Sequence, residues 1–301
     1  DVYRSITDSI VAAIEAGPGV FRMPWHWMGP KSGRPVNALT GRPYRGVNVV
    51  MLWAEARKRG FESCHWATYR QWRELGAQVR RGERSSIIVF YKEIEVAAPE
   101  GQQDEEGESP ATRLVVRASR VFNAAQVNGW QAPVQPPRSR VEKLDNAEVF
   151  IRATGADIRE RGNHAFYNPG ADYIQVPPRD SFIGTPSSSP TETFYSTLCH
   201  ELTHWSGHKS RLNRELSGRF GDRAYAAEEL VAELGAAFLC ADLGITNMPR
   251  LDHAQYIASW FMLMRDDKRA IFATAARAAA AAEFLAAFST AKIDAVAVEG
   301  S

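Results

Sequence analysis

The chain has 301 residues, 45% hydrophobic and 24% charged, which is enough for two ordinary domains with hydrophobic cores. Its three cysteines are widely spaced, which excludes a disulfide framework and a Cys-x-x-Cys site and indicates a reducing cytoplasm. No apolar run approaches the length of a membrane span, no signal peptide opens the chain, and the net charge is only +1, so we expect a cytoplasmic protein without a membrane partner.

Turn residues and apolar spacing predict mixed α/β structure in the first part of the chain. We expect helices at residues 2–15, 47–59 and 65–75, an irregular aromatic-rich loop after the first helix, and strands at 86–96 and 114–122. A Glu- and Gly-rich segment at 99–110 is expected to form an exposed tip between these strands. Prolines at 133–137 predict a linker, so we divide the chain into domains at 1–132 and 141–301 with a linker at 133–140.

The net charge conceals a strong asymmetry along the chain. Residues 20–92 contain 14 lysines and arginines against 4 acidic residues, whereas residues 93–108 contain seven acidic residues and no basic one. The same basic stretch contains eleven aromatic residues, five of them tryptophans. Cations that follow a phosphate backbone, interleaved with aromatic faces on which bases stack, are typical of proteins that bind single-stranded nucleic acid without sequence preference.

Each of these features has a plainer interpretation, because tryptophans are usually core residues and paired arginines are often solvated helix ends. The charge excess over one contiguous stretch nevertheless favours nucleic-acid binding, with double-stranded DNA as the alternative partner. The residues that we expect to contact the strand are Arg22, Trp25, Trp27, Lys31, Arg34, Arg42, Arg45, Arg80 and Arg81.

The second part of the chain is expected to be mainly helical, so the predicted fold class is α+β. Helices are predicted at residues 141–154, 197–205, 226–238, 254–264 and 269–288. Short strands are predicted at 165–167 and 172–176, and a Ser- and Pro-rich loop at 185–190.

A His-Glu-x-x-His motif inside the predicted helix at 197–205 indicates a metal site. His200 and His204 are about one turn apart and project from the same face, so two imidazoles can meet one cation. Glu201 points to the neighbouring flank, where it can accept a proton from a metal-bound water instead of filling a ligand position. Apolar neighbours indicate a buried helix, where histidines and carboxylates without partners are costly. The alternative is a pair of satisfied core histidines.

A zinc enzyme needs a third protein ligand, and the next predicted helix supplies candidates. Glu229 and Glu233 are one turn apart on a largely apolar helix, which suits a ligand and a residue that orients a ligating histidine. Glu228 is expected to face elsewhere. His208 is the competing ligand, but a continuous helix would place it roughly 12 Å along the axis from His200, too far to share a metal.

Several short motifs, spread over nearly the whole chain, occur together in one known family. They are Pro24-Trp25, Asn37-x-x-Thr40-Gly41-x-x-Tyr44-x-Gly46-x-Asn48, Trp66-x-Thr68, Phe122-Asn123-x-x-Gln126, His200-Glu201-Leu202-Thr203-His204-Trp205-Ser206-Gly207-His208 and Tyr225-Ala226-x-Glu228-Glu229-Leu230-x-Ala232-Glu233. In these motifs the chain resembles the ArdC-type antirestriction proteins of conjugative plasmids, which are related to the N-terminal parts of some TraC-type primases. The resemblance implies an N-terminal domain that binds single-stranded DNA, a C-terminal zincin-like metallopeptidase domain, and protection of incoming plasmid DNA from host restriction during conjugation.

The expected reaction is zinc-assisted hydrolysis of a peptide bond in an unknown protein substrate, such as a host restriction component. His200, His204 and Glu229 would hold the zinc, for which manganese or another divalent metal is the alternative. Glu201 would remove the proton of the attacking water, and Glu233 would hold a histidine N–H. The candidates for an oxyanion donor are Tyr225, Tyr256 and His208.

Two rival functions remain at this point. The first is a non-catalytic DNA-coating protein with a structural metal, which would require a fourth protein ligand where the enzyme keeps an open position. The second is a metal-dependent nuclease, which is less favoured because such sites gather carboxylates around magnesium or manganese.

Overall fold

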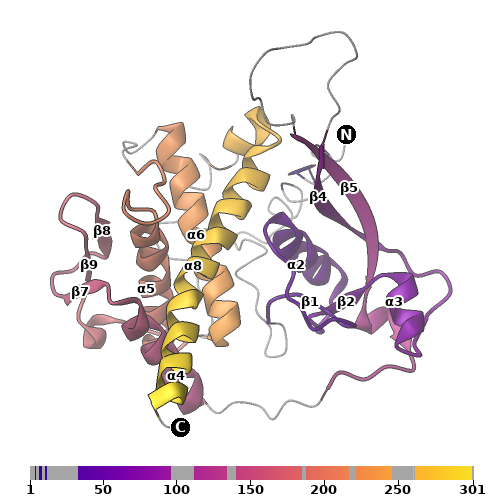
Figure 1. Ribbon diagram of the computed structural model, residues 1–301, viewed down its shortest axis with the longest axis horizontal. Coiled ribbons are helices and arrows are strands. Elements are labelled where there is room, and N and C mark those ends of the chain that lie inside the picture. Colours follow the sequence, from indigo (N-terminus) through magenta and orange to yellow (C-terminus); the bar gives the residue numbers. More distant parts are fainter. Residues whose placement is uncertain are drawn as a thin grey trace.

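A computed structural model of the protein describes residues 33–95, 112–133, 140–184, 188–216, 222–245 and 262–299, with the single positions 4, 7, 8, 11 and 260 (Figure 1). Several predicted features lie outside these residues. They are most of the helices at 2–15 and 254–264, the loop with Trp25 and Trp27, the acidic tip at 99–110, and most of the linker.

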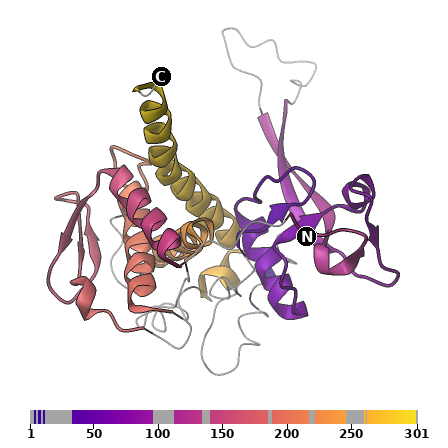
Figure 2. The same cartoon turned by 90° about the horizontal axis from the view of Figure 1, so that it is seen from below.

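A four-stranded sheet organises the first half of the chain, in the order β1-β2-β5-β4. Its strands are β1 (Val36–Asn37), β2 (His65–Ala67), β4 (Ser86–Glu95) and β5 (Thr112–Asn123). β4 and β5 pair antiparallel from Ser86↔Val121 to Glu95↔Thr112 and form a long ribbon that leaves the body (Figure 2). The predicted strand pair is confirmed.

The helix α2 (Val47–Arg59), which confirms another prediction, closes the free edge of this sheet. Buried Asn48 donates from Nδ2 to the carbonyl of Val89 at 2.7 Å and accepts from its N–H at 2.8 Å. One side-chain amide thus replaces the missing neighbour strand at this point of β4, because it satisfies both backbone groups of Val89.

The predicted helix at 65–75 was wrong in its first turn. β2 occupies His65–Ala67, and α3 (Tyr69–Glu74) begins only after Thr68, whose side chain accepts from the backbone of Gln71 in a capping box. Beyond α3, β3 (Gln78–Val79) pairs antiparallel with β6 (Val127–Asn128), which follows the short helix η2 (Ala124–Gln126). Two-residue strands show no sequence period, so neither was predicted.

The second half is mainly helical, as predicted. Its helices are α4 (Arg140–Thr154), α5 (Pro190–Ser206), α6 (Arg223–Leu243) and α8 (Ala270–Glu299), with the short helix η3 (Arg179–Ser181). Helices α5, α6 and α8 pack together, and a three-stranded sheet lies beside α5 (Figure 1). The sheet has the order β7-β9-β8, with β7 (Asp157–Glu160), β8 (Phe166–Asn168) and β9 (Tyr173–Val176).

α5 and α6 approach each other closely at Gly235. A Cβ atom at this position would lie 2.5 Å from Cγ2 and 2.7 Å from Oγ1 of Thr203, which is itself fully buried. Only glycine permits this spacing without a shift, so Gly235 sets how near the two helices lie.

The two halves share one hydrophobic core. The ring of Trp53 on α2 lies 5.8 Å from that of Phe238 on α6, and both side chains are buried. Beside them, Arg34 Nη1 lies 2.9 Å from Asp242 Oδ2 at the end of α6. One cluster of buried side chains thus contains residues from both sides of the predicted linker at 133–140.

The helix α8 corrects one expectation from the sequence. Its residues Ala270–Ser289 are long and apolar enough, by length and composition, to cross a membrane. Half of this stretch is buried inside the protein, where α8 packs against α6, α4 and α5. The apolar run is thus used as a core helix in this fold.

Candidate metal centre

The helix α5 carries both histidines of the motif, and its first residue is fixed by a cap. Ser189 caps the helix, its side chain accepting from the N–H of Glu192, and Pro190 occupies the first turn. His200 and Glu201 lie three turns further on and are only 3% and 2% exposed. The motif therefore lies in the interior, where its polar atoms need partners.

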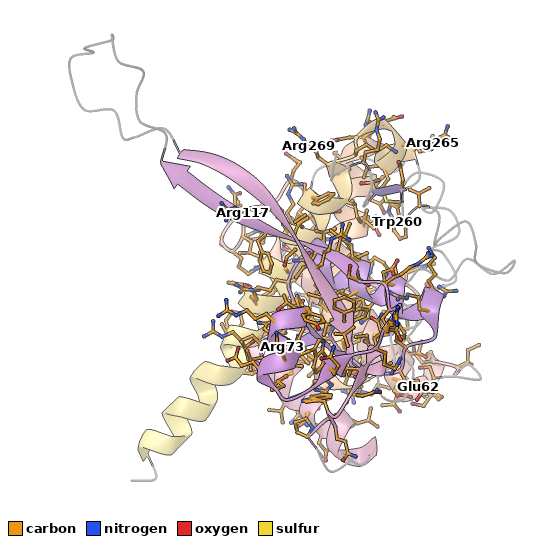
Figure 3. The ribbon with its side chains drawn as sticks, turned by 90° about the vertical axis from the view of Figure 1, so that its right-hand side faces the viewer. Glu62, Arg73, Arg117, Trp260, Arg265 and Arg269 are labelled. Atoms are coloured by element: carbon orange, nitrogen blue, oxygen red, sulfur yellow. The ribbon has the colours of Figure 1, made fainter. Side chains whose placement is uncertain are left out.

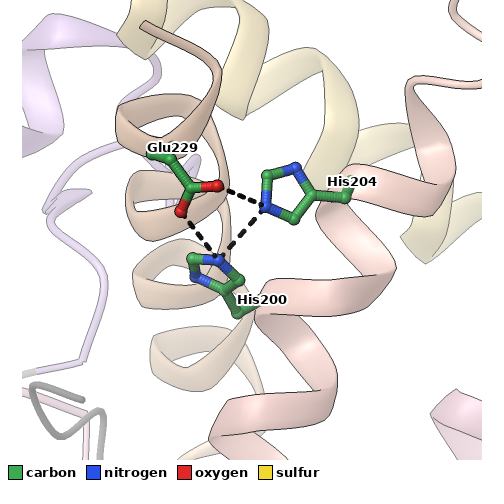
Figure 4. Close-up of side chains that lie close together, drawn as sticks. All are labelled: His200, His204 and Glu229. Atoms are coloured by element: carbon green, nitrogen blue, oxygen red, sulfur yellow. Dashed lines mark hydrogen bonds and ion pairs between the residues drawn. The ribbon is translucent and has the colours of Figure 1, made fainter. Parts of the chain in front are cut away.

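Three donor atoms converge between α5 and α6 (Figure 4). The Nε2 atoms of His200 and His204 are 3.2 Å apart. Glu229 Oε2 lies 3.6 Å from His200 Nε2, and Glu229 Oε1 lies 3.6 Å from His204 Nε2. The structure thus brings together the three residues that the sequence predicted as metal ligands.

These separations fit a tetrahedral metal site. Zn–N and Zn–O bonds of about 2.0–2.2 Å at tetrahedral angles put neighbouring ligand atoms roughly 3.3 Å apart. The 3.2 Å between the two nitrogens and the 3.6 Å from each nitrogen to its nearer carboxylate oxygen lie close to that spacing, and one ligand atom from each residue lies within 4.8 Å of the other two. Two imidazole nitrogens and one carboxylate are also a donor set that divalent transition metals favour.

His204 is held from its other side by Glu228, which corrects the prediction that Glu228 faces elsewhere. His204 Nδ1 lies 3.2 Å from Glu228 Oε1, so the ring donates its Nδ1–H to the carboxylate and keeps the Nε2 lone pair for a metal. Arg214 in turn donates to both oxygens of Glu228, at 2.9 and 3.1 Å. Burial raises the pKa of Glu228, but the bonds from His204 and Arg214 bring it below its usual value.

His200 has a carboxylate in the corresponding place, which is the position predicted for Glu233. Glu233 Oε2 lies 3.8 Å from His200 Nδ1, and Glu233 is buried. Along α6, Glu228 lies opposite His204 and Glu233 opposite His200, so the two helices run antiparallel across the centre. Each imidazole therefore has its Nε2 at the donor cluster and its Nδ1 beside a carboxylate.

Glu201 and His208 remain outside the donor cluster among the described residues. Glu201 is buried beside His200, where a proton acceptor is predicted. His208 lies in the turn after α5, and its Nδ1 is 2.7 Å from the hydroxyl of Ser210. Tyr225 is half-buried at the start of α6, and Tyr256 lies outside the described residues.

The predicted DNA-contacting residues fall into three groups. Arg22, Trp25, Trp27 and Lys31 lie outside the described residues. Arg42, Arg80 and Arg81 are exposed, and Arg45 is exposed but forms an ion pair with Glu283 of α8.

Arg34 requires a correction, because its guanidinium is 8% exposed. It donates to Asp242 and to the carbonyl of Tyr44 and lies over the ring of Phe238. A side chain held in this way cannot reach a DNA strand, and it joins the two halves instead.

The described tryptophans of the basic stretch are core residues. Trp53, Trp66 and Trp72 are at most 2% exposed, so the plainer interpretation of these three was correct. Among the described residues of this stretch, the large aromatic side chains that are exposed are Tyr69 and Phe90, at 46% and 51% exposure. Sequence reasoning missed both, because composition does not say which ring faces solvent.

Two family descriptions match this chain. Residues 1–122 match the N-terminal domain of anti-restriction factor ArdC, and residues 145–277 match a zincin-like metallopeptidase. The protein y4eC of Sinorhizobium fredii is 44% identical over 286 residues, which are 95% of this chain and 91% of that protein. A DNA primase TraC of Escherichia coli is 35% identical over 298 residues, but these span only 27% of the primase.

Two crystal structures of the antirestriction protein ArdC from plasmid R388 have the same fold. The metal-free structure shares 40% identity with a TM-score of 0.77, and the Mn(II)-bound structure shares 38% with a TM-score of 0.71. Each similarity covers 96% of this chain and 98% of the other.

Proposed function

This chain belongs to the ArdC family of antirestriction proteins, and we propose that it is a metal-dependent peptidase that also binds single-stranded DNA. The observation that supports the peptidase most strongly is the donor cluster of His200, His204 and Glu229, with Glu228 and Glu233 behind the two rings. Such outer carboxylates accompany functional metal sites, because they fix the tautomer and the orientation of the ligating rings.

Zinc is the metal that we propose for the centre, with manganese as the alternative because a related structure contains Mn(II). Zinc supplies Lewis-acid chemistry when bound, polarising a carbonyl and lowering the pKa of a water. The protein itself supplies the fixed imidazoles, a dry surrounding and a proton acceptor. Glu201 Oε would accept a proton from the attacking water and pass it to the leaving amine.

The number of protein donors separates this proposal from a structural metal. Among the described residues the cluster contains three ligating side chains, which is the number found in catalytic zinc sites, whereas structural sites have four. A nuclease is less well supported, because two of the three donors are imidazoles and not carboxylates.

The proposed DNA binding is assigned to the first half. Its support is the basic, aromatic-rich composition of residues 20–92 and the match of residues 1–122 to the N-terminal ArdC domain. Because the core is shared, we propose that the division at the linker 133–140 separates two functions. DNA binding is assigned to residues 1–132 and the peptidase to residues 141–301. By similarity to the R388 protein, we propose a cytoplasmic role in protecting plasmid DNA from host restriction.

One experiment tests the peptidase directly. Purified protein, loaded with zinc or manganese, is incubated with a mixed peptide library, with and without single-stranded DNA, and cleavage is followed by mass spectrometry. Glu201→Gln should retain the metal and lose cleavage by about 100-fold or more, since general base catalysis contributes about 10²–10⁴-fold. Glu62→Gln, at an exposed position in the first half, is the matched control and should cleave normally.

One result would contradict the peptidase and another the role of Glu201. If the fully loaded wild type cleaves no peptide in either condition, the metal is structural. If Glu201→Gln cleaves as fast as the wild type, the protein is a peptidase in which another residue accepts the proton.

A further inference from the structure

We propose that an open pocket in the first half binds one nucleotide of a single DNA strand, with its base on Tyr69 and its phosphate beside Arg81. The pocket has a volume of about 620 Å³, within the roughly 300–1,000 Å³ of small-ligand sites. Its walls are Tyr69, Gln78, Val79, Arg80, Arg81, Glu83, Phe122 and Asn128. This inference rests on the proposed DNA binding and locates one nucleotide-binding site within the first half.

The pairing of β3 with β6 puts two amides side by side at the pocket. Gln78 is the direct partner of Asn128, and Val79 is the direct partner of Val127. Opposite residues in a ladder share a face and the next pair takes the other, so both amides are exposed while both valines are buried. Neutral amides can bond a base edge of any kind.

Two aromatic rings stand beside these amides. The rings of Tyr69 and Phe122 are 6.5 Å apart at 68°, and Tyr69 is 46% exposed. Gln78 Nε2 donates to Tyr69 Oη at 3.0 Å, and buried Trp72 donates to the carbonyl of Phe122 at 3.0 Å. The Tyr69 ring is thus held by Gln78 and by its edge contact with Phe122 before a ligand arrives, which lowers the entropic cost of stacking a base.

One positive charge at the pocket is not offset. Arg80 donates to Glu83 Oε1 and to the carbonyl of Ala125, both at 2.6 Å, so its charge is paired. Arg81 is exposed and has no ion pair or hydrogen bond among the described residues. A phosphate beside Arg81 would therefore pair with a guanidinium whose charge no carboxylate of the pocket already neutralises.

Further arginines on the same side can hold the strand on either side of that nucleotide. Figure 3 shows two of them, Arg73 on α3, the helix that also carries Tyr69, and Arg117 on β5, the strand that also carries Phe122, and both are exposed. Duplex DNA does not fit the proposal, because a base that is paired and stacked cannot lie on the Tyr69 ring.

The test uses the full chain and two fluorescein-labelled 20-mers, one of deoxythymidine and one with the same backbone but abasic sites. Binding is measured by fluorescence anisotropy over a range of salt concentrations. Tyr69→Ala should weaken binding of the thymidine strand by about fivefold or more and leave the abasic strand unchanged. Tyr69→Phe keeps the stacking face and loses only the bond from Gln78, so it should weaken binding of the thymidine strand much less than Tyr69→Ala does and should also leave the abasic strand unchanged. Arg81→Ala should weaken both and reduce the salt slope by about 0.7.

Arg277→Ala is the matched control, since this exposed arginine lies on α8 and has no partner among the described residues. If the wild type binds neither strand, the proposed DNA binding itself fails. If the wild type binds and Tyr69→Ala and Arg81→Ala behave like the control, the pocket is overturned while DNA binding stands. A loss of binding to both strands by Tyr69→Ala, with a lowered melting temperature, would also overturn it.

Discussion

The metal centre and the basic surface of the first half use charged side chains in opposite ways. Between α5 and α6, the imidazoles and the carboxylate of the donor cluster each have oppositely polar side chains within 3.2–3.8 Å. On the first half, exposed arginines such as Arg42 and Arg81 have no such partner among the described residues. A site that positions one ion needs every atom fixed, whereas a surface that follows a phosphate chain gains from charges that can move.

This difference predicts how each region responds to one substitution. Losing a ligand removes one of the few bonds to a single ion, and no neighbouring side chain can replace that bond. Losing one arginine would remove one of several similar phosphate contacts in the proposed DNA binding, so we expect binding to weaken by a small factor.

The largest expected effect is at the ligands themselves. His204→Ala or Glu229→Ala should lower the affinity for zinc by more than about 100-fold, because even the outer partners of such sites contribute about 10- to 100-fold. Metal content after dialysis against a weak chelator measures this, and His208→Ala is the matched control. Metal that is retained by Glu229→Ala but lost by His208→Ala would overturn the ligand assignment.

The next effect is at Glu228, which the sequence did not single out. Glu228→Gln keeps the shape but weakens the acceptor for His204 Nδ1–H, so zinc affinity should fall by about 10- to 100-fold. Competition with a zinc dye gives the dissociation constant, and Glu62→Gln serves as control. If Glu228→Gln binds zinc like the wild type, the carboxylate only anchors Arg214.

Sequence reasoning found the ligands because His200 and His204 share one helix, and their spacing fixes their geometry. It missed Glu228 because it considered only which residues of one helix share a face. Adjacent residues diverge by about 100° on a helix, so Glu228 and Glu229 were assigned to different faces. In the structure, Glu229 lies between the two rings and Glu228 reaches the outer side of His204, so both directions are used.

The first half was less predictable for a physical reason. The strands β4 and β5 are long enough to show an apolar pattern, whereas β1, β3 and β6 have two residues each. Composition predicted a basic, aromatic-rich region, but it cannot tell a core tryptophan such as Trp72 from an exposed ring such as Tyr69. Arg34 and Arg42 likewise count the same in the composition, but Arg34 is buried and Arg42 is exposed.

The third prediction concerns the helix spacing on which the metal centre depends. Gly235→Ala gains about 1 kcal/mol in helix propensity but overlaps Thr203, and overpacking costs about 1–3 kcal/mol, so we expect a net loss of stability. Combined with Thr203→Ala, it should cost at least about 1 kcal/mol less than the sum of the single changes. Denaturant unfolding of the four proteins measures this coupling. Strict additivity would show that Thr203 does not limit the approach.

The smallest effect tests whether two arginines of the basic stretch really differ. Arg34→Ala should lower the free energy of unfolding by about 1 kcal/mol, because the carboxylate of Asp242 is surrounded by protein atoms on one side but its side chain is still 43% exposed, so its charge is partly screened. Arg42→Ala should change it by less than about 0.5 kcal/mol. Equal losses from the two substitutions would remove the distinction between them.

The pH dependence sharpens this test. Burial raises the pKa of Asp242 and Arg34 lowers it, with a net rise above its usual value. A carboxyl with a raised folded pKa stabilises the fold while protonated, and this contribution is lost as pH rises through that pKa. Without Arg34 the pKa rises further, so the deficit of Arg34→Ala should be largest at neutral pH and shrink as the carboxyl is protonated. Urea unfolding from neutral to acidic pH measures it, and a deficit that does not change with pH would show that Arg34 stabilises the fold through its contact with Phe238 and not through its ion pair with Asp242.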